Sequence, residues 1–146
     1  MKRLNLLLAD DDSDDCLFFE EALSEISPDS TILVKKDGEE VLNYLFHPQS
    51  ILPDIIFLDI NLPLMSGWEI LVELKKLEEL KKVPVIMYST SSSPRDKDIA
   101  RDLGAICFFT KPHNYKTLVK MMEIVVDKMN NNSIPQICSA VKEMLN

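Results

Sequence analysis

The fold is decided by the stretch LLLADDD at residues 6–12, in which an apolar run of strand length ends in three adjacent carboxylates. A second apolar run, IIFL at residues 55–58, also ends in an acid, Asp59. If both runs form neighbouring buried strands, their acids converge on one crevice, where like charges repel unless a hard cation such as Mg²⁺ offsets them. We therefore expect the functional site at the ends of these strands.

Composition places the chain among ordinary globular proteins. Its 146 residues are 46% hydrophobic and 27% charged, which predicts one domain with a substantial core. The net charge of -8 argues against nucleic-acid binding, which needs a basic face, and favours basic protein partners.

Hydrophobic patterning argues against a membrane location. No stretch approaches the roughly 18 to 20 apolar residues that a membrane span needs, because charges interrupt every long run. The basic start MKR resembles a signal peptide, but the apolar run at residues 4–9 is short, contains Asn5 and ends in acids. We expect a soluble, cytoplasmic protein.

The three cysteines, Cys16, Cys107 and Cys138, give little support for a cross-linked framework. Their number is odd and they lack C-x-x-C spacing. We expect buried or incidental thiols, without a disulfide framework or a structural zinc site.

Periodicity predicts alternating strands and helices. Apolar runs of strand length, with little polar alternation, lie at residues 4–9, 31–34, 55–58, 85–88 and 106–109, and predict five buried parallel strands. Helical stripes lie between and after them: Phe19, Ala22, Leu23 and Ile26; Val41, Leu42, Leu45 and Phe46; Ile70, Leu71, Leu74 and Leu77; Ile99, Ala100 and Leu103; Leu118, Met121, Met122 and Val125. Asp12 or Ser13 is expected to cap the first helix, and Gly104 to end the fourth. The chain is thus predicted to be an α/β protein, a doubly wound (βα)5 fold with helices on both faces of its sheet.

In a doubly wound sheet, ligands bind beyond the carboxyl ends of the strands. Asp10, Asp11, Asp59, Ser89 and Lys111 each fall at, or just after, the end of a predicted strand. We expect these five side chains to share one rim of the sheet.

The identities and spacings of these residues form a pattern. It consists of the acidic pair Asp10-Asp11, a D-x-x-x-P-x-x-x-G motif at Asp59, Pro63 and Gly67, the hydroxyl of Ser89, and the dipeptide Lys111-Pro112. Ser89 and Lys111 follow Asp59 by 30 and 52 residues. The pattern resembles the receiver domain of two-component response regulators over nearly the whole chain. It is similar to the chemotaxis receiver and to stand-alone receivers paired with phytochrome-type kinases. The resemblance implies a flavodoxin-like three-layer sandwich with strand order 2-1-3-4-5, and a cis peptide before Pro112.

The acidic residues suit a divalent cation. Asp10, Asp11 and one oxygen of Asp59, with the backbone carbonyl of Asn61, are expected to hold Mg²⁺, and Mn²⁺ is a possible substitute. Alternation along a strand leaves open which of Asp10, Asp11 and Asp12 face the metal, and alignment with the family favours the first two.

The remaining polar residues have roles in phosphoryl transfer. Asp59 is a competent carboxylate nucleophile, whose attack yields an aspartyl phosphate. The Lys111 ammonium and the Ser89 hydroxyl are aimed at the charge on the transferring group. Ser89 and Phe108, which stands where many receivers carry Tyr, are the expected switch pair.

Other interpretations compete with this one. Taken alone, the acids of residues 10–15 form a solvated helix cap and Lys111 is a surface lysine. A Mg²⁺-dependent phosphatase of the haloacid dehalogenase type carries D-x-D after its first strand, here Asp10-x-Asp12, and would use Asp10 as nucleophile. The acceptor motif at Asp59 ranks that interpretation far lower. A pseudo-receiver that binds partners without phosphorylation is disfavoured by the complete acidic set and Lys111.

The domain plan assigns residues 1–129 to the receiver and residues 130–146 to a polar linker with a short amphipathic helix. That helix either docks on its own domain or forms a dimer or partner contact. The expected function is a signalling switch and not an enzyme: it takes its phosphoryl group from a sensor histidine kinase or a histidine phosphotransfer protein and loses it slowly. Output is expected through protein contacts, including a homodimer through the C-terminal segment or the face of the fourth helix, fifth strand and fifth helix, where Leu118 and Met121 lie.

Overall fold

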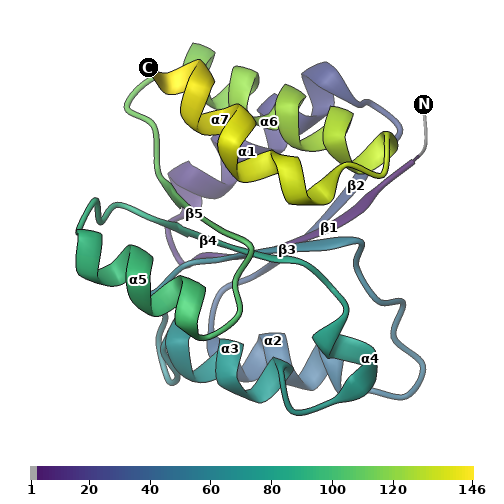
Figure 1. The fold of residues 1–146 in the computed structure, drawn as a ribbon. Coiled ribbons are helices and arrows are strands. Elements are labelled where there is room, and N and C mark those ends of the chain that lie inside the picture. Colours follow the sequence, from purple (N-terminus) through teal and green to yellow (C-terminus); the bar gives the residue numbers. More distant parts are fainter. Residues whose placement is uncertain (1–2) are drawn as a thin grey trace.

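The computed structural model describes residues 3–146 and contains a five-stranded parallel sheet (Figure 1). The strands are β1 (Asn5–Ala9), β2 (Thr31–Lys35), β3 (Ile55–Leu58), β4 (Val85–Ser89) and β5 (Cys107–Thr110). Their order in the sheet is β2-β1-β3-β4-β5. The predicted doubly wound α/β fold and its strand order are confirmed.

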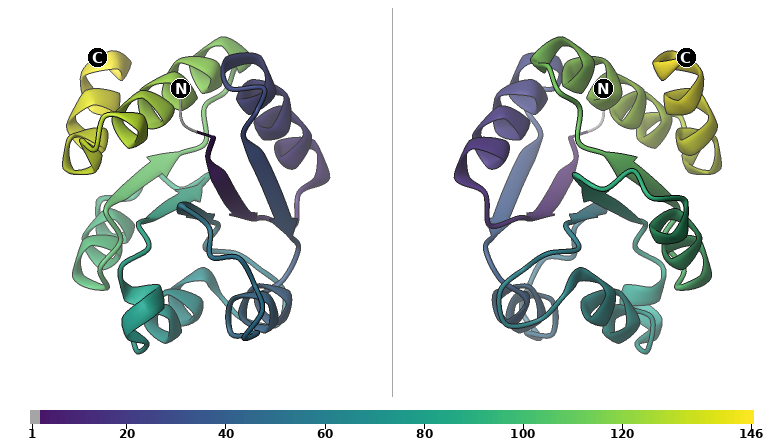
Figure 2. Two further views of the ribbon diagram at one scale, coloured as in Figure 1. Left: turned by 90° about the vertical axis from the view of Figure 1, so that its right-hand side faces the viewer. Right: turned by 90° about the vertical axis from the view of Figure 1, so that its left-hand side faces the viewer.

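Helices cover both faces of the sheet, so that the molecule has three layers (Figures 1 and 2). One face carries α1 (Ser13–Ile26), α6 (Tyr115–Asn130), the short 3-10 helix η1 (Ile134–Gln136) and α7 (Ile137–Leu145). The other face carries α2 (Gly38–Leu45), α3 (Gly67–Leu74), α4 (Glu78–Lys81) and α5 (Pro94–Asp102). The alternating sequence produces this arrangement because each crossover between parallel strands returns over one face of the sheet.

Local signals explain where the helices begin and end. Asp12 caps α1, and its Oδ1 accepts hydrogen bonds from the backbone N–H groups of Asp14 and Asp15, at 2.9 and 3.1 Å. Gly104 follows α5 with a φ of 98°, a left-handed conformation that glycine adopts without strain. The third helix is shorter than its stripe predicted: α3 ends at Leu74, and Leu77 is exposed just before the separate turn α4.

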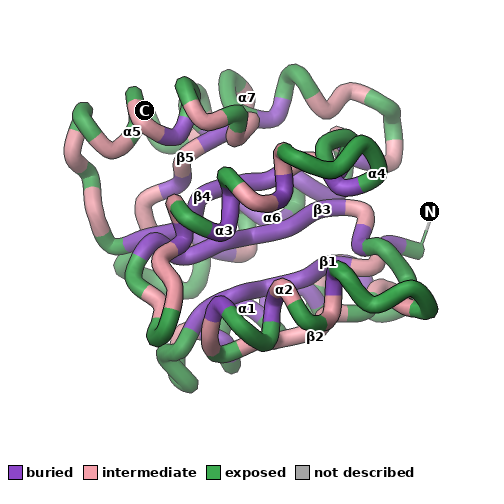
Figure 3. Tube along the Cα trace, turned by 90° about the horizontal axis from the view of Figure 1, so that it is seen from below, coloured by how far each residue is buried: buried purple, intermediate pink, exposed green. Residues whose placement is uncertain are grey.

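Burial follows position in the sheet (Figure 3). Strands β3 and β4 are buried throughout, and β1 is buried from its second residue onward. The prediction of five buried strands is wrong for β2, which has no buried residue, and for β5, where only alternate residues are buried. Both are edge strands, so each lacks a neighbour on one side and part of its cover by helices.

The C-terminal helix α7 packs on the same core as α1 and α6. Its Ile137 and Val141 are buried against this core, at 0% and 1% exposure. Leu118 and Met121 of α6 are buried in the same core. The expectation that these two side chains support a dimer is therefore wrong, because they point into the domain instead of toward solvent.

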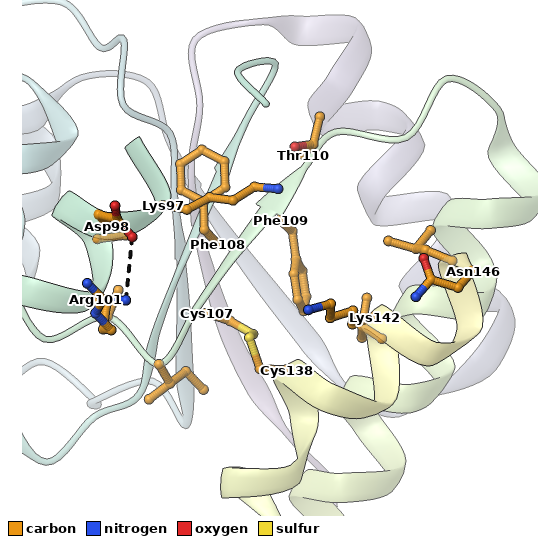
Figure 4. Close-up of a pocket in the computed structure, with 15 residues that line it drawn as sticks. Lys97, Asp98, Arg101, Cys107, Phe108, Phe109, Thr110, Cys138, Lys142 and Asn146 are labelled. Atoms are coloured by element: carbon orange, nitrogen blue, oxygen red, sulfur yellow. Dashed lines mark ion pairs between the residues drawn. A yellow bond between two sulfur atoms is a disulfide. The ribbon is translucent and has the colours of Figure 1, made fainter. Parts of the chain in front are cut away.

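A disulfide joins Cys107 of β5 to Cys138 of α7, with 5.5 Å between their α-carbons (Figure 4). This corrects the prediction of three free thiols. The odd number of cysteines argued against a disulfide, but it reflects one free cysteine, the buried Cys16, beside one disulfide. Fold topology brings Cys107 and Cys138 together across 31 residues of chain. Beside the disulfide, a cavity of about 540 Å³ lies between α5, β5 and α7.

The structure has no candidate for a membrane span within residues 3–146, because no helix there is both long enough and apolar enough to cross a bilayer.

Candidate functional site

Backbone hydrogen bonds of the sheet fix the strand ends at which the candidate site lies. The parallel hydrogen-bond pattern continues one residue past the strands: the Asp59 N–H donates to the Ala9 carbonyl at 2.9 Å, and the Lys111 N–H donates to the Ser89 carbonyl at 2.7 Å. These contacts fix neighbouring strand ends relative to one another. The structure therefore brings Asp10, Asp11, Asp59, Ser89 and Lys111 to one rim, as predicted.

The ammonium of Lys111 lies at the centre of the site and contacts three carboxylates. Its Nζ lies 2.8 Å from Asp10 Oδ2, 2.8 Å from Asp15 Oδ2 and 3.0 Å from Asp59 Oδ2. The Lys111 side chain is 9% exposed, so these ion pairs are shielded from water. Lys111 is thus not the surface lysine that the competing interpretation assumed.

The charged groups of the site shift one another's pKa. Burial alone lowers the pKa of Lys111, but Asp10, Asp15 and Asp59 together outweigh it and raise that pKa above the ordinary lysine value. Burial raises the pKa of Asp10, and contact with Lys111 opposes the increase. The site therefore keeps a fixed positive charge beside a carboxylate that is costly to bury.

The acidic residues are arranged as a divalent cation requires. One carboxylate oxygen from each of Asp10, Asp11 and Asp59 lies within 4.8 Å of the others. Asp10 is fully buried, and its Oδ2 accepts no well-aligned hydrogen bond although the Lys111 ammonium is close. A buried carboxylate oxygen with spare capacity is an unusual feature that a hard cation satisfies. The residues present fit such an ion.

Two further predicted residues lie around Asp59. The Asn61 N–H donates to Asp59 Oδ1 at 3.3 Å, and the Asn61 side chain is exposed. Ser89 is 1% exposed, and its Oγ accepts the Ser91 N–H at 3.3 Å. Within residues 3–146, Ser89 makes no hydrogen bond to Asp59, so its hydroxyl is free to take another partner on the same rim.

Phe108 is partly buried and packs toward the core on the side of α2, α3 and α5. It lies on the α5 side of β5, whereas Phe109 lies on the α7 side (Figure 4). Ser89 and Phe108 are on adjacent strands, whose pairing aligns Met87 with Phe108 and Ser89 with Thr110. Phe108 therefore lies on the strand next to Ser89, two residues before the residue that pairs with it.

The cis peptide implied before Pro112 is contradicted, because no peptide bond within residues 3–146 is cis. The peptide bond between Lys111 and Pro112 is trans, and the long Lys111 side chain still brings its ammonium to Asp10 and Asp59.

Asp15 is the member of the site that sequence reasoning missed. It lies in the first turn of α1, where an acid is expected to cap a helix, and its carboxylate instead contacts Lys111. Spacing from the capping residue Asp12 places Asp15 in that turn, but only the packing of α1 on the sheet shows that it faces Lys111.

Comparison with known proteins agrees with this geometry. Residues 6–123 match the family described as the response regulator receiver domain. Response regulator Rcp1 of Synechocystis is 32% identical over 122 residues, which cover 81% of this chain and 83% of that protein. The probable transcriptional regulator ycf27 of Guillardia theta is 31% identical, and the match covers 86% of this chain but 46% of that longer protein.

Solved structures show the same fold. The phosphorylated cyanobacterial phytochrome response regulator RcpA superposes with a TM-score of 0.82 at 29% identity, over 90% of this chain and 96% of that one. The Mn²⁺-bound form of Rcp1 gives a TM-score of 0.75 at 30% identity, over 86% and 92%. The chemotaxis response regulator CheY4 of Vibrio cholerae gives 0.73 at 27% identity, over 85% and 99%. Sequence, topology and the acidic rim agree, and the chain belongs to the response regulator receiver family.

Proposed function

We propose that Asp59 accepts a phosphoryl group from the phosphohistidine of a sensor histidine kinase or a histidine phosphotransfer protein, in a reaction that requires Mg²⁺. The observation that carries the proposal is the setting of the Asp59 carboxylate. One oxygen lies 3.0 Å from the Lys111 ammonium, and the carboxylate is part of the acidic cluster with Asp10 and Asp11. A nucleophile flanked by a fixed cation and a cation site suits attack on a phosphoryl group.

The only reactants in the phosphoryl transfer are the phosphohistidine donor and the Asp59 carboxylate. An oxygen of Asp59 attacks phosphorus, the bond from phosphorus to the donor imidazole nitrogen breaks, and that nitrogen keeps the electron pair and takes up a proton. The product is an acyl phosphate on Asp59, which water later hydrolyses slowly. Lys111 and Ser89 donate to the equatorial oxygens, where charge accumulates during transfer.

The metal ligands in this proposal are the carboxylates of Asp10, Asp11 and Asp59 and the backbone carbonyl of Asn61. When bound, Mg²⁺ neutralises charge on the phosphoryl oxygens. Mn²⁺ is expected to substitute, and the Mn²⁺-bound structure of the relative Rcp1 supports this.

Output is proposed to pass through protein contacts after a shift in the packing of Ser89 and Phe108. The two residues lie on adjacent strands, and Phe108 lines the cavity between α5, β5 and α7. A change in Phe108 would therefore alter a surface, either the α5-β5-α6 face or α7, through which a homodimer could form. In this plan residues 1–129 are the receiver and residues 130–146 an appended segment.

The proposed donor is a cytoplasmic kinase of the phytochrome type. The matched RcpA is a cyanobacterial phytochrome response regulator, two further similar structures are a bacteriophytochrome response regulator and a response regulator in red-light signalling, and the match to Rcp1 covers 83% of that protein. The acidic surface of this chain suits a basic docking face on such a donor.

Phosphorylation with acetyl phosphate tests the proposal without a known kinase. The protein is incubated with acetyl phosphate and Mg²⁺, and intact mass spectrometry followed by peptide mapping locates the adduct. We expect one phosphoryl group on Asp59, lost in Asp59→Asn and retained in Asp102→Asn, a control at an exposed acid of α5. Loss of labelling on removal of Mg²⁺ by a chelator is also expected.

Three outcomes would contradict the proposal. Labelling that persists in Asp59→Asn would place the acceptor elsewhere. Continuous phosphate release in Asp59→Asn, abolished by Asp10→Asn, would favour the phosphatase interpretation, and absence of any label in the native protein would favour the pseudo-receiver.

A further inference from the structure

The Lys111 ammonium has three N–H donors, and the structure gives it three carboxylate partners at 2.8 to 3.0 Å. Two of them have other tasks in the proposed reaction, since Asp10 belongs to the cation cluster and Asp59 carries the phosphoryl group. The third, Asp15, lies outside the cluster of Asp10, Asp11 and Asp59. It is therefore the partner of Lys111 without another assigned role.

The position of Asp15 is fixed by α1. Its backbone N–H donates to Asp12 Oδ1 at 3.1 Å, and the next residue, Cys16, is buried against the sheet. The Asp15 side chain is 34% exposed, compared with 9% for Asp59 and 0% for Asp10. Asp15 is thus the most exposed of the three carboxylates that contact Lys111.

The other two partners of Lys111 change during the reaction. A cation at the acidic cluster would compete with the ammonium for Asp10 and Asp59, and phosphorylation of Asp59 would exchange its carboxylate contact with Lys111 for one to the phosphoryl oxygens. Lysine carries its charge on a flexible stem, so an ammonium that loses partners samples other positions. Among the three carboxylates that contact Lys111, Asp15 is the one whose contact neither event removes.

We infer that Asp15 is a positioning residue, which holds the Lys111 ammonium in the crevice while Asp10 and Asp59 are engaged in phosphoryl transfer. The inference rests on the proposed function of Asp59. It assigns Asp15 no contact with the phosphoryl group: Asp15 acts through Lys111.

The first test compares the rates of phosphorylation by acetyl phosphate. Asp15→Asn removes the charge, Asp15→Glu keeps it, and Asp14→Asn is a matched control that removes one charge from the same exposed turn. Within the described residues, the Asp14 carboxylate makes no ion pair. We expect Asp15→Asn to slow phosphorylation about tenfold, less than the 10²–10³ that follows loss of a direct donor. Asp15→Glu should recover most of the rate, and Asp14→Asn should match the native protein.

The second test is a double-mutant cycle with Lys111→Met. If Asp15 acts through Lys111, Asp15→Asn has no further effect on the phosphorylation rate once Lys111 is absent. Equal slowing in both backgrounds would overturn the inference, as would a native rate in Asp15→Asn or slowing of the same size in Asp14→Asn.

A third test needs no phosphodonor. NMR of the ¹⁵N-labelled ammonium of Lys111 in the presence of Mg²⁺, which is expected to engage Asp10 and Asp59, should give a signal protected from exchange in the native protein and in Asp14→Asn. That signal should broaden in Asp15→Asn, and an unchanged signal there would overturn the inference. The Asp59→Asn control separates the two claims: if phosphorylation survives that change, the proposed function fails, whereas loss of labelling in Asp59→Asn with a native rate in Asp15→Asn refutes only the role of Asp15.

Discussion

Gly67 lies so close to the main chain of Asp59 that a side chain at residue 67 would overlap the Asp59 carbonyl group. A β-carbon built on Gly67 would meet the Asp59 carbonyl oxygen and lie 2.9 Å from the adjoining carbonyl carbon. The Gly67 N–H also donates to the Ile60 carbonyl at 2.7 Å, which fastens the start of α3 to the end of β3. The glycine of the acceptor motif thus sets the backbone position of the nucleophile.

Gly67→Ala should therefore impair both stability and phosphorylation. Because the obstacle is backbone, the chain must shift, and we expect a loss of about 1 to 3 kcal/mol in the free energy of unfolding. Urea denaturation measures this loss, and acetyl phosphate labelling should show slower phosphorylation of the folded fraction. Gly104→Ala is the control: its positive φ makes alanine strained, but a β-carbon there would meet only the flexible Lys75 side chain, and Gly104 precedes the start of β5, whereas Lys111 follows its end. Equal effects of both variants on phosphorylation would contradict the role given to Gly67.

Removal of the Lys111 charge should destabilise the ion-free protein, because three carboxylates then lose their common partner. Lys111→Met is expected to cost about 3 kcal/mol in the free energy of unfolding, the scale for breaking a shielded ion pair from one side. Addition of Mg²⁺ should raise the melting temperature of this variant more than that of the native protein, since the ammonium no longer competes with the cation. Lys116→Met, at an exposed position, should behave like the native protein, and an equal Mg²⁺ response in all three proteins would argue against a shared acidic site.

The disulfide between Cys107 and Cys138 should contribute measurably to stability. Closing a separation of 31 residues restricts the unfolded chain, and the loop-entropy relation gives about 3 to 4 kcal/mol. Reductant should therefore lower the melting temperature of the native protein. The same reductant should leave Cys138→Ser unchanged, and a shift of equal size in that variant would show that the bond is not the cause.

The Tyr115 hydroxyl should lose its proton at a higher pH than an ordinary tyrosine does. Its hydroxyl donates to Glu25 Oε2 at 2.8 Å, and this hydrogen bond to a carboxylate raises the pKa of Tyr115 to about 12. A raised pKa means that the contact favours the neutral phenol. Its contribution to stability is therefore complete below pH about 10, the unfolded value, and is lost as pH rises toward 12. NMR titration of the tyrosine ring carbons should show this, and Glu25→Gln should return the pKa of Tyr115 toward 10. An unchanged titration in Glu25→Gln would contradict the assignment.

Most of the site could be predicted from the sequence because its residues lie at or directly after the ends of strands. Parallel strands that end at one edge bring Asp10, Asp59 and Lys111 together whatever the details of packing, and apolar runs mark those ends in the sequence. Asp15 could not be found in this way, because its contact with Lys111 depends on how α1 lies over the sheet.

The other corrections have the same origin in tertiary packing. The exposure of β2 depends on its place at the edge, which the run at residues 31–34 does not encode. Pairing of Cys107 with Cys138 depends on α7 returning to β5. Leu118 and Met121 have the apolar character of an interface, but the same character suits a core, and only the fold distinguishes the two.

The hydrogen bonds from Asp59 to Ala9 and from Lys111 to Ser89 use main-chain atoms alone. Replacing a reactive side chain on this edge leaves those bonds intact, so an inert variant such as Asp59→Asn should retain native architecture. Such a variant could occupy the donor kinase without receiving phosphate, and would then act as a dominant competitor of the native protein inside a cell.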